Sequence, residues 1–75
     1  MNIFKDEEQA EILSVKINKI GFAVNYEIKD NHVTAILKKT ERYKGGFDLE
    51  KWKVTLANHI QPNLVENKTV SIEYA

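Results

Sequence analysis

Residues 22–39, FAVNYEIKDNHVTAILKK, decide the fold of this 75-residue chain. Apolar and polar residues alternate on both sides of Asp30-Asn31, which is the pattern of two half-buried strands. Asp and Asn both tolerate positive φ, so this pair predicts a two-residue turn and an antiparallel hairpin. The resulting register pairs Lys29 with His32, Ile28 with Val33, Tyr26 with Ala35, Val24 with Leu37, and Phe22 with Lys39. A slip of one residue would break the apolar match, so the register is well specified.

A helix is predicted before the hairpin, from Asp6 to Ile20. Its acidic first turn and its basic last turn both complement the helix dipole, and Gly21 follows as a stop. Ala10, Leu13, Ile17 and Ile20 form one narrow apolar stripe. Ile12 and Val15 lie on a second side of the helix, which indicates either a wide buried face or a contact with a partner.

A second helix and a third strand are predicted after the hairpin. Asp48 is a suitable N-cap, and Phe47 and Trp52 have the spacing of a hydrophobic staple. The apolar stripe Leu49, Trp52, Leu56 and Ile60 ends at Gln61-Pro62, because a residue before proline is pushed out of the α region. Residues 69–74 alternate again and predict a strand.

The chain is therefore predicted to be a single domain, residues 1–75, of the α+β class in the order α-β-β-α-β. We expect a two-layer sandwich with both helices on one face of a three-stranded sheet. A right-handed crossover makes the second and third strands parallel, and we expect the sheet order 3-1-2, with the second strand at an edge. The alternative closes Leu64 to Tyr74 as a second small hairpin around Asn67-Lys68. The core is expected to contain Leu13, Ile17, Val24, Tyr26, Leu37, Trp52, Leu56 and Ile72.

The composition excludes several classes of protein. Eleven Lys and Arg balance eleven Asp and Glu, and there is no cysteine, so neither a disulfide framework nor a thiolate metal cluster is expected. The apolar runs are far shorter than the roughly 20 residues of a membrane span, and the N-terminus turns acidic where a signal peptide would become apolar. We therefore expect a soluble cytoplasmic protein that does not bind membranes.

No catalytic motif is found in the chain, so no enzyme activity, catalytic residue, cofactor or metal ion is expected. His32 is interpreted as a solvated residue beside the hairpin turn. His59 is interpreted as a partner for the free carbonyls at the end of the second helix. The acidic cluster Glu7, Glu8 and Glu11 is interpreted as a solvated helix face, and a docking patch for a basic partner is the alternative.

Two surfaces are candidates for binding. The sheet face away from the helices is predicted to be flat and weakly charged, and we expect it to bind another protein or a second copy of the chain, as a homodimer, through Ala23, Asn25, Thr34 and Ile36. The edge strands add a second route, pairing with a partner's strand.

The second surface is the basic segment that follows the hairpin. This segment is the candidate for nucleic-acid binding. Its basic side chains, Lys38, Lys39, Arg42 and Lys44, would contact phosphates, and Tyr43 would stack on an exposed nucleobase. The alternative is a solvated connector in which Lys38 and Lys39 protect an edge strand from pairing. The favoured function is that of a small non-catalytic interaction or accessory protein. Bacterial accessory proteins and phage proteins are often of this size. A nucleic-acid-binding module is the alternative function.

Overall fold

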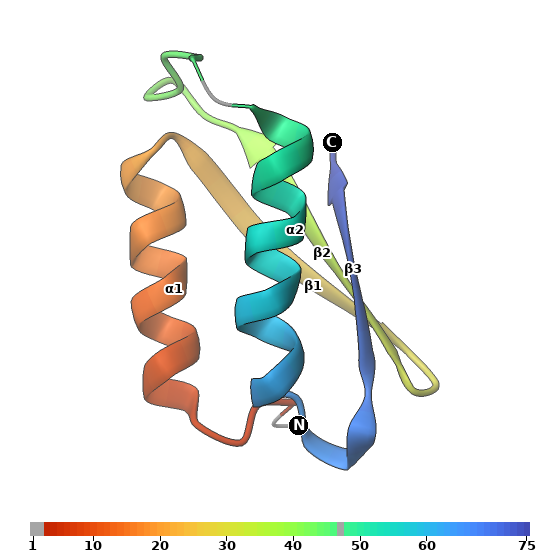
Figure 1. Ribbon diagram of the computed structural model, residues 1–75. Helices are drawn as coiled ribbons and strands as arrows, with labels where there is room; N and C mark the ends of the chain where they lie inside the picture. Colours follow the sequence, from red (N-terminus) through yellow and green to blue (C-terminus); the bar gives the residue numbers. More distant parts are fainter. Residues whose placement is uncertain (1–2, 47) are drawn as a thin grey trace.

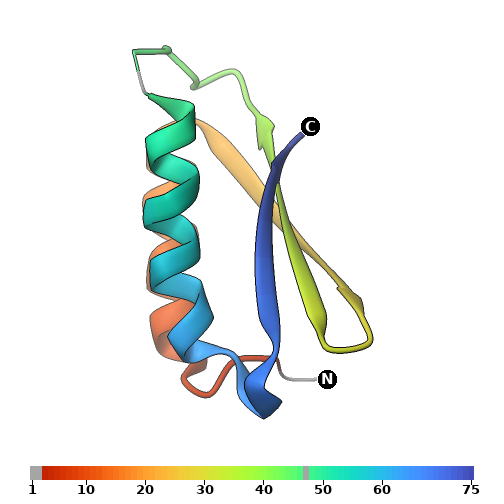
Figure 2. The same cartoon turned by 45° about the vertical axis from the view of Figure 1, so that its right-hand side comes forward.

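The computed structural model describes residues 3–46 and 48–75. Its elements follow in the order α1 (Glu7–Lys19), β1 (Phe22–Lys29), β2 (His32–Lys39), α2 (Leu49–Ile60) and β3 (Thr69–Tyr74), with short 3-10 segments at Gln61–Asn63 and Val65–Asn67. The α+β class and the element order are confirmed (Figure 1). Both helices lie on the same side of the sheet in the view along the layers (Figure 2).

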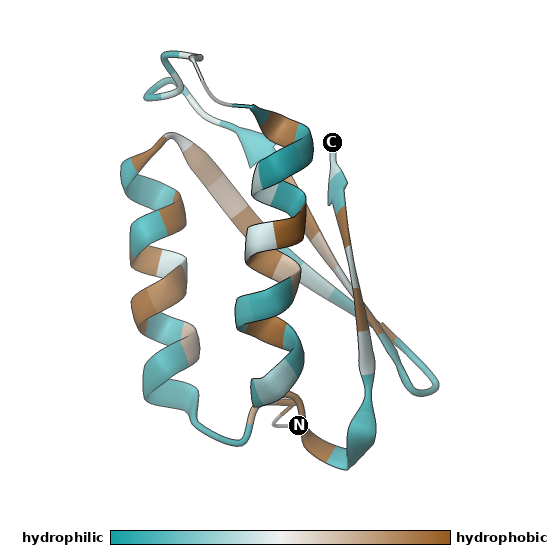
Figure 3. Ribbon diagram, in the orientation of Figure 1, coloured by the Kyte–Doolittle hydropathy of each residue, from teal (hydrophilic) through white to brown (hydrophobic). Residues whose placement is uncertain are grey.

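The predicted hairpin register is confirmed along the whole length of β1 and β2. Val24 lies opposite Leu37 and Tyr26 opposite Ala35, and the strands meet at Lys29 and His32. Asp30 adopts the positive φ that the tight turn requires, at 55°. Hydrophilic residues surround the tip of this hairpin (Figure 3).

The predicted strand order 3-1-2 is wrong, because β3 pairs with β2 and the order is β1-β2-β3. The parallel relation of β2 and β3 is confirmed, with Val33 opposite Val70 and Ala35 opposite Ile72. β2 is thus the central strand, and Val33, Ala35 and Leu37 are, with Phe22, the most deeply buried residues of the hairpin. The interpretation of Lys38 and Lys39 as guards of an edge strand falls with this order.

The alternative hairpin over Leu64 to Tyr74 is also wrong. Leu64 instead forms an antiparallel bridge with Phe4. The Lys5 N–H donates to the Asn63 carbonyl at 2.7 Å, and the Val65 N–H donates to the Ile3 carbonyl at 3.0 Å. Ile3 and Leu64 are both buried, so burial of two apolar side chains favours this pairing between the start of the chain and the segment before β3.

The predicted helix ends agree with the structure. The Asp6 side chain caps α1 by accepting from the N–H groups of Glu8 and Gln9, and the Asp48 side chain caps α2 by accepting from Lys51 N–H. α2 ends at Ile60, just before Gln61-Pro62. The staple expected between Phe47 and Trp52 falls on Phe47, which lies outside the described residues.

The core lies between the helices and the sheet, around Phe22. The Phe22 ring, fully buried, packs against the rings of Tyr43 at 4.8 Å, Trp52 at 5.2 Å and Tyr74 at 5.7 Å between centroids. The predicted core residues Ile17, Leu37, Leu56 and Ile72 are buried, while Leu13, Val24, Tyr26 and Trp52 are partly buried and pack against that core. Across the residues that the structure describes, no helix has both the length and the apolar character needed to cross a membrane.

Candidate functional site

The open face of the sheet brings the four predicted protein-binding residues together. Ala23 and Asn25 come from β1, and Thr34 and Ile36 come from β2. Ile36 is half-buried in the middle of this face, because Asn25 lies opposite it on β1 and Glu73 opposite it on β3. The strand order thus places the Glu73 carboxylate beside Ile36, whereas the predicted order would have placed Glu73 beside β1.

His32 belongs to the same open face and is not simply solvated. Its Nδ1 lies 2.6 Å from the Thr69 hydroxyl, and its Nε2 lies 2.8 Å from the Ser71 hydroxyl. Both ring nitrogens therefore join β2 to β3 by hydrogen bonds. This role was missed because the sequence pattern placed β3 next to β1, away from His32.

The outer edge of β3 presents backbone groups in an alternating pattern. Thr69 N–H donates to the Asn31 carbonyl at 2.9 Å and Ala75 N–H donates to the Leu37 carbonyl at 2.9 Å, so the odd-numbered residues face β2. Val70, Ile72 and Tyr74 consequently direct their N–H and C=O groups away from the sheet. Glu73 is the one charged residue in this strand.

The start of this edge is already occupied by a side chain. The Gln61 amide donates from Nε2 to the Lys68 carbonyl and accepts at Oε1 from the Val70 N–H, over 3.0 Å. A neighbouring strand would satisfy the same two backbone groups in the same way. At the start of the β3 edge, the Gln61 side chain therefore takes the place of a neighbouring strand. Further along the edge, the backbone N–H and C=O groups of Ile72 and Tyr74 point outward.

The basic segment is only partly free to bind. Lys38, Lys39, Arg42 and Lys44 are exposed, whereas Tyr43 is half-buried. The Tyr43 ring packs against the Phe22 ring. The Lys39 ammonium lies 4.8 Å from the centre of the same Tyr43 ring. The backbone of this segment passes close to the end of α1, because Gly21 lies against the backbone of Arg42 and Tyr43. The tyrosine thus contributes to the core as well as to the segment surface.

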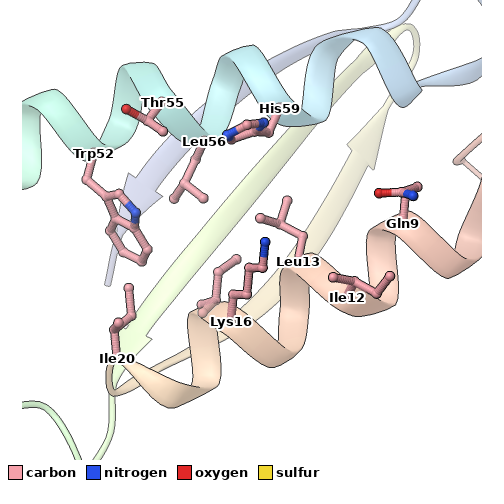
Figure 4. Close-up of a pocket in the computed structure, with 10 residues that line it drawn as sticks. Gln9, Ile12, Leu13, Lys16, Ile20, Trp52, Thr55, Leu56 and His59 are labelled. Atoms are coloured by element: carbon pink, nitrogen blue, oxygen red, sulfur yellow. The ribbon is translucent and has the colours of Figure 1, made fainter.

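A groove between α1 and α2 was not anticipated. It is open to solvent and has a volume of about 490 Å³, and its lining includes the buried side chains of Ile17 and Leu56. Figure 4 shows Leu13 of α1 and Ile20, the residue after α1, facing Trp52 and Leu56 of α2 across it. The remaining lining residues are Gln9, Ile12, Lys16, Thr55 and His59. The sequence signal that could have indicated a gap was Ile12, an apolar residue outside the main stripe of the helix.

Among the described residues, the two titratable groups with shifted pKa values are tyrosines. Burial raises the pKa of the Tyr26 phenol, and the Ser14 side chain opposes that rise. Burial also raises the pKa of Tyr74, and the negative charge of Glu50 adds to the effect. Within residues 3–46 and 48–75, no group of three or more His, Cys, Asp or Glu could hold a metal ion.

Comparison with known proteins adds no further information on the site: no protein-family model, no curated protein and no solved structure matches this chain.

Proposed function

We propose that this protein is a small non-catalytic binding module that takes up an extended segment of another protein along the outer edge of β3. The observation that supports this is the Gln61 amide, which pairs with Lys68 and Val70 as a strand would. Beyond it, the Val70 carbonyl, both backbone groups of Ile72 and the Tyr74 N–H point outward. An added strand would continue the ladder over these groups.

The neighbouring side chains define the chemistry of the segment that would fit. On the helix side an added strand would lie beside Val70 and Ile72, which favours apolar and β-branched residues. On the open side it would lie beside Ser71 and Glu73, and a basic residue opposite Glu73 would be favoured by charge. A partner that continued over the open face would also cover Thr34 and Ile36. The expected ligand is therefore an alternating segment with one Lys or Arg.

The test uses random displayed peptides of about twelve residues, selected on the intact protein. Selected peptides are expected to alternate as described. Their binding should survive Tyr74→Ala and be lost in Tyr74→Pro, because both variants lose the ring and only the proline loses the outward N–H. Equal binding to both variants would show that main-chain pairing at Tyr74 plays no part, and the proposal would fail.

A nucleic-acid-binding module is the second proposal, supported by the exposure of all four bases of the segment. A labelled single-stranded oligonucleotide tests it. Binding should fall steeply with salt and disappear when Lys38, Lys39, Arg42 and Lys44 are replaced together by Ser. Ile36→Glu serves as the matched variant on the open sheet face. That change should leave oligonucleotide binding intact but abolish binding of a protein that covers the face, since a charge in a desolvated interface costs several kcal/mol.

A further inference from the structure

The outward side of α1 carries a short heptad pattern opposite to the side that packs on the sheet. Glu8, Ile12, Val15 and Lys19 follow one another at intervals of four, three and four residues. That spacing places them on one narrow seam of the helix. Ile17, on the opposite side of α1, is 1% exposed, whereas Ile12 is 43% exposed and Val15 is 48% exposed. Two large apolar side chains therefore lie at the centre of an otherwise charged outer surface.

Within residues 3–46 and 48–75, Glu8 and Lys19 form no ion pair. Glu8 and Lys19 are eleven residues apart, about 16 Å along the axis, and cannot meet on one helix. Among the described residues, the single ion pair joins Lys68 to Glu66. The acid at the start and the base at the end also complement the helix dipole, so the charges alone would suit a monomer equally well. The exposed apolar pair between them has no such explanation, since Ile12 borders the groove between α1 and α2 but stays 43% exposed and Val15 lies outside that groove.

From these observations we infer that α1 is a self-association surface, which pairs with α1 of a second copy in antiparallel orientation. A two-fold axis through the middle of the seam sets Ile12 against Val15 of the second copy, and Glu8 against Lys19 of the second copy. Both contacts occur twice, and every charge on the seam meets its opposite. At the flanks of the seam, Glu11 faces Asn18 of the second copy, and Lys16 faces Gln9 of the second copy. No like charges meet.

The parallel arrangement is less favourable on the same seam. It would set Glu8 against Glu8 and Lys19 against Lys19, at both ends of the apolar pair. The antiparallel pairing also aligns the two helix dipoles favourably. A seam of 13 residues buries less than the roughly 800 Å² per partner of a standard interface, so the dimer is expected to be weak. This surface is separate from the β3 edge and does not depend on the function proposed above.

Charge-swapped variants test the seam. Wild-type protein should show a reversible monomer–dimer equilibrium by sedimentation between about 10 µM and about 1 mM. Glu8→Lys alone and Lys19→Glu alone should each weaken it by about tenfold or more, because like charges then meet twice. An equimolar mixture of the two variants should recover the association as a heterodimer. Glu7→Lys is the matched control, since it changes the same charge in the same turn off the seam, and it should associate like wild type.

Cross-linking tests the orientation. The natural chain has no cysteine, so Glu8→Cys and Lys19→Cys each carry one thiol. Mild oxidation of their mixture should yield a covalent heterodimer, and Glu8→Cys alone should yield little. A monomeric wild type at the highest concentration would overturn the inference. So would a dimer that Glu8→Lys leaves unchanged, or faster cross-linking of Glu8→Cys to itself.

Discussion

The side-chain carbonyl of Gln61 accepts a hydrogen bond from the backbone N–H of Val70 over 3.0 Å. Gln61 comes directly after α2, and Val70 lies in the edge strand β3. Together with the bond to the Lys68 carbonyl, this contact ties the end of the helix to the start of the strand. It also closes the first two positions of an otherwise open edge, which is one way to limit unwanted strand pairing.

Replacing Gln61 by Ala should therefore have two effects. The free energy of unfolding should fall by about 1–2 kcal/mol, because a donor and an acceptor of the backbone lose their partner. The open edge should also become longer, so light scattering at high concentration should increase. Gln61→Glu is the matched control, since it keeps the acceptor for Val70 N–H and loses only the donor. An Ala variant as stable and as soluble as wild type would contradict this role.

Gly21 should tolerate no side chain. Its φ of 102° is unfavourable for other residues, and an added Cβ would overlap the backbone of Tyr43 and Arg42. Gly21→Ala should lower the free energy of unfolding by more than about 2 kcal/mol. Gly45→Ala provides the comparison, because Gly45 also has a positive φ, 79°, but open space around it. Denaturant titration of both variants should show the larger loss at Gly21, and equal losses would refute the close approach.

Leu56 is the test of the core. It is 2% exposed and packs in the main cluster of buried residues. Leu56→Ala should cost about 2–5 kcal/mol, a large part of the stability of a domain of this size. Thermal unfolding measures the effect, and Val54→Ala on the exposed side of α2 is the control, expected to change little. An unchanged melting temperature for Leu56→Ala would contradict the observed packing of α2.

The hairpin and the helix ends could be predicted because local residues determine them. Alternation around Asp30-Asn31 fixes the register, and Asp6 and Asp48 mark the helix starts by their capping chemistry. The strand order could not be predicted in the same way. The helical crossover makes β2 and β3 parallel, but it does not determine which strand lies next to β3. One signal was available: β2 carries Ile36 on its open face where β1 carries Asn25. A large apolar residue on the second face of a strand is more typical of the centre of a sheet than of its edge.

The candidate sites divide in the same way. Ala23, Asn25, Thr34 and Ile36 were predicted to share a face, because the hairpin register alone requires it. The Gln61 bridge and the groove between the helices depend on how distant segments pack, and a glutamine after a helix has no distinctive pattern. His32 was misinterpreted for the same reason, since its two hydroxyl partners come from a strand that was expected elsewhere.

Stability should fall in alkaline solution, partly through Tyr26. Burial raises the pKa of this phenol in the folded state above its ordinary value of 10.0. The folded chain therefore holds the proton more tightly, and the free energy of unfolding falls as the pH rises above about 10. In Tyr26→Phe this alkaline loss should be smaller than in wild type. Denaturant titrations at neutral and alkaline pH compare the two, and an identical pH dependence would remove Tyr26 as a cause.

The most direct measurement of the β3 edge is amide hydrogen exchange followed by NMR. In the free protein the Ser71 and Glu73 amides, which face β2, should exchange slowly, while those of Ile72 and Tyr74 should exchange faster within the same strand. Addition of a selected peptide should slow exchange at Ile72 and Tyr74 as new main-chain hydrogen bonds form. Unchanged exchange at these two amides, with the peptide bound, would contradict strand addition at β3.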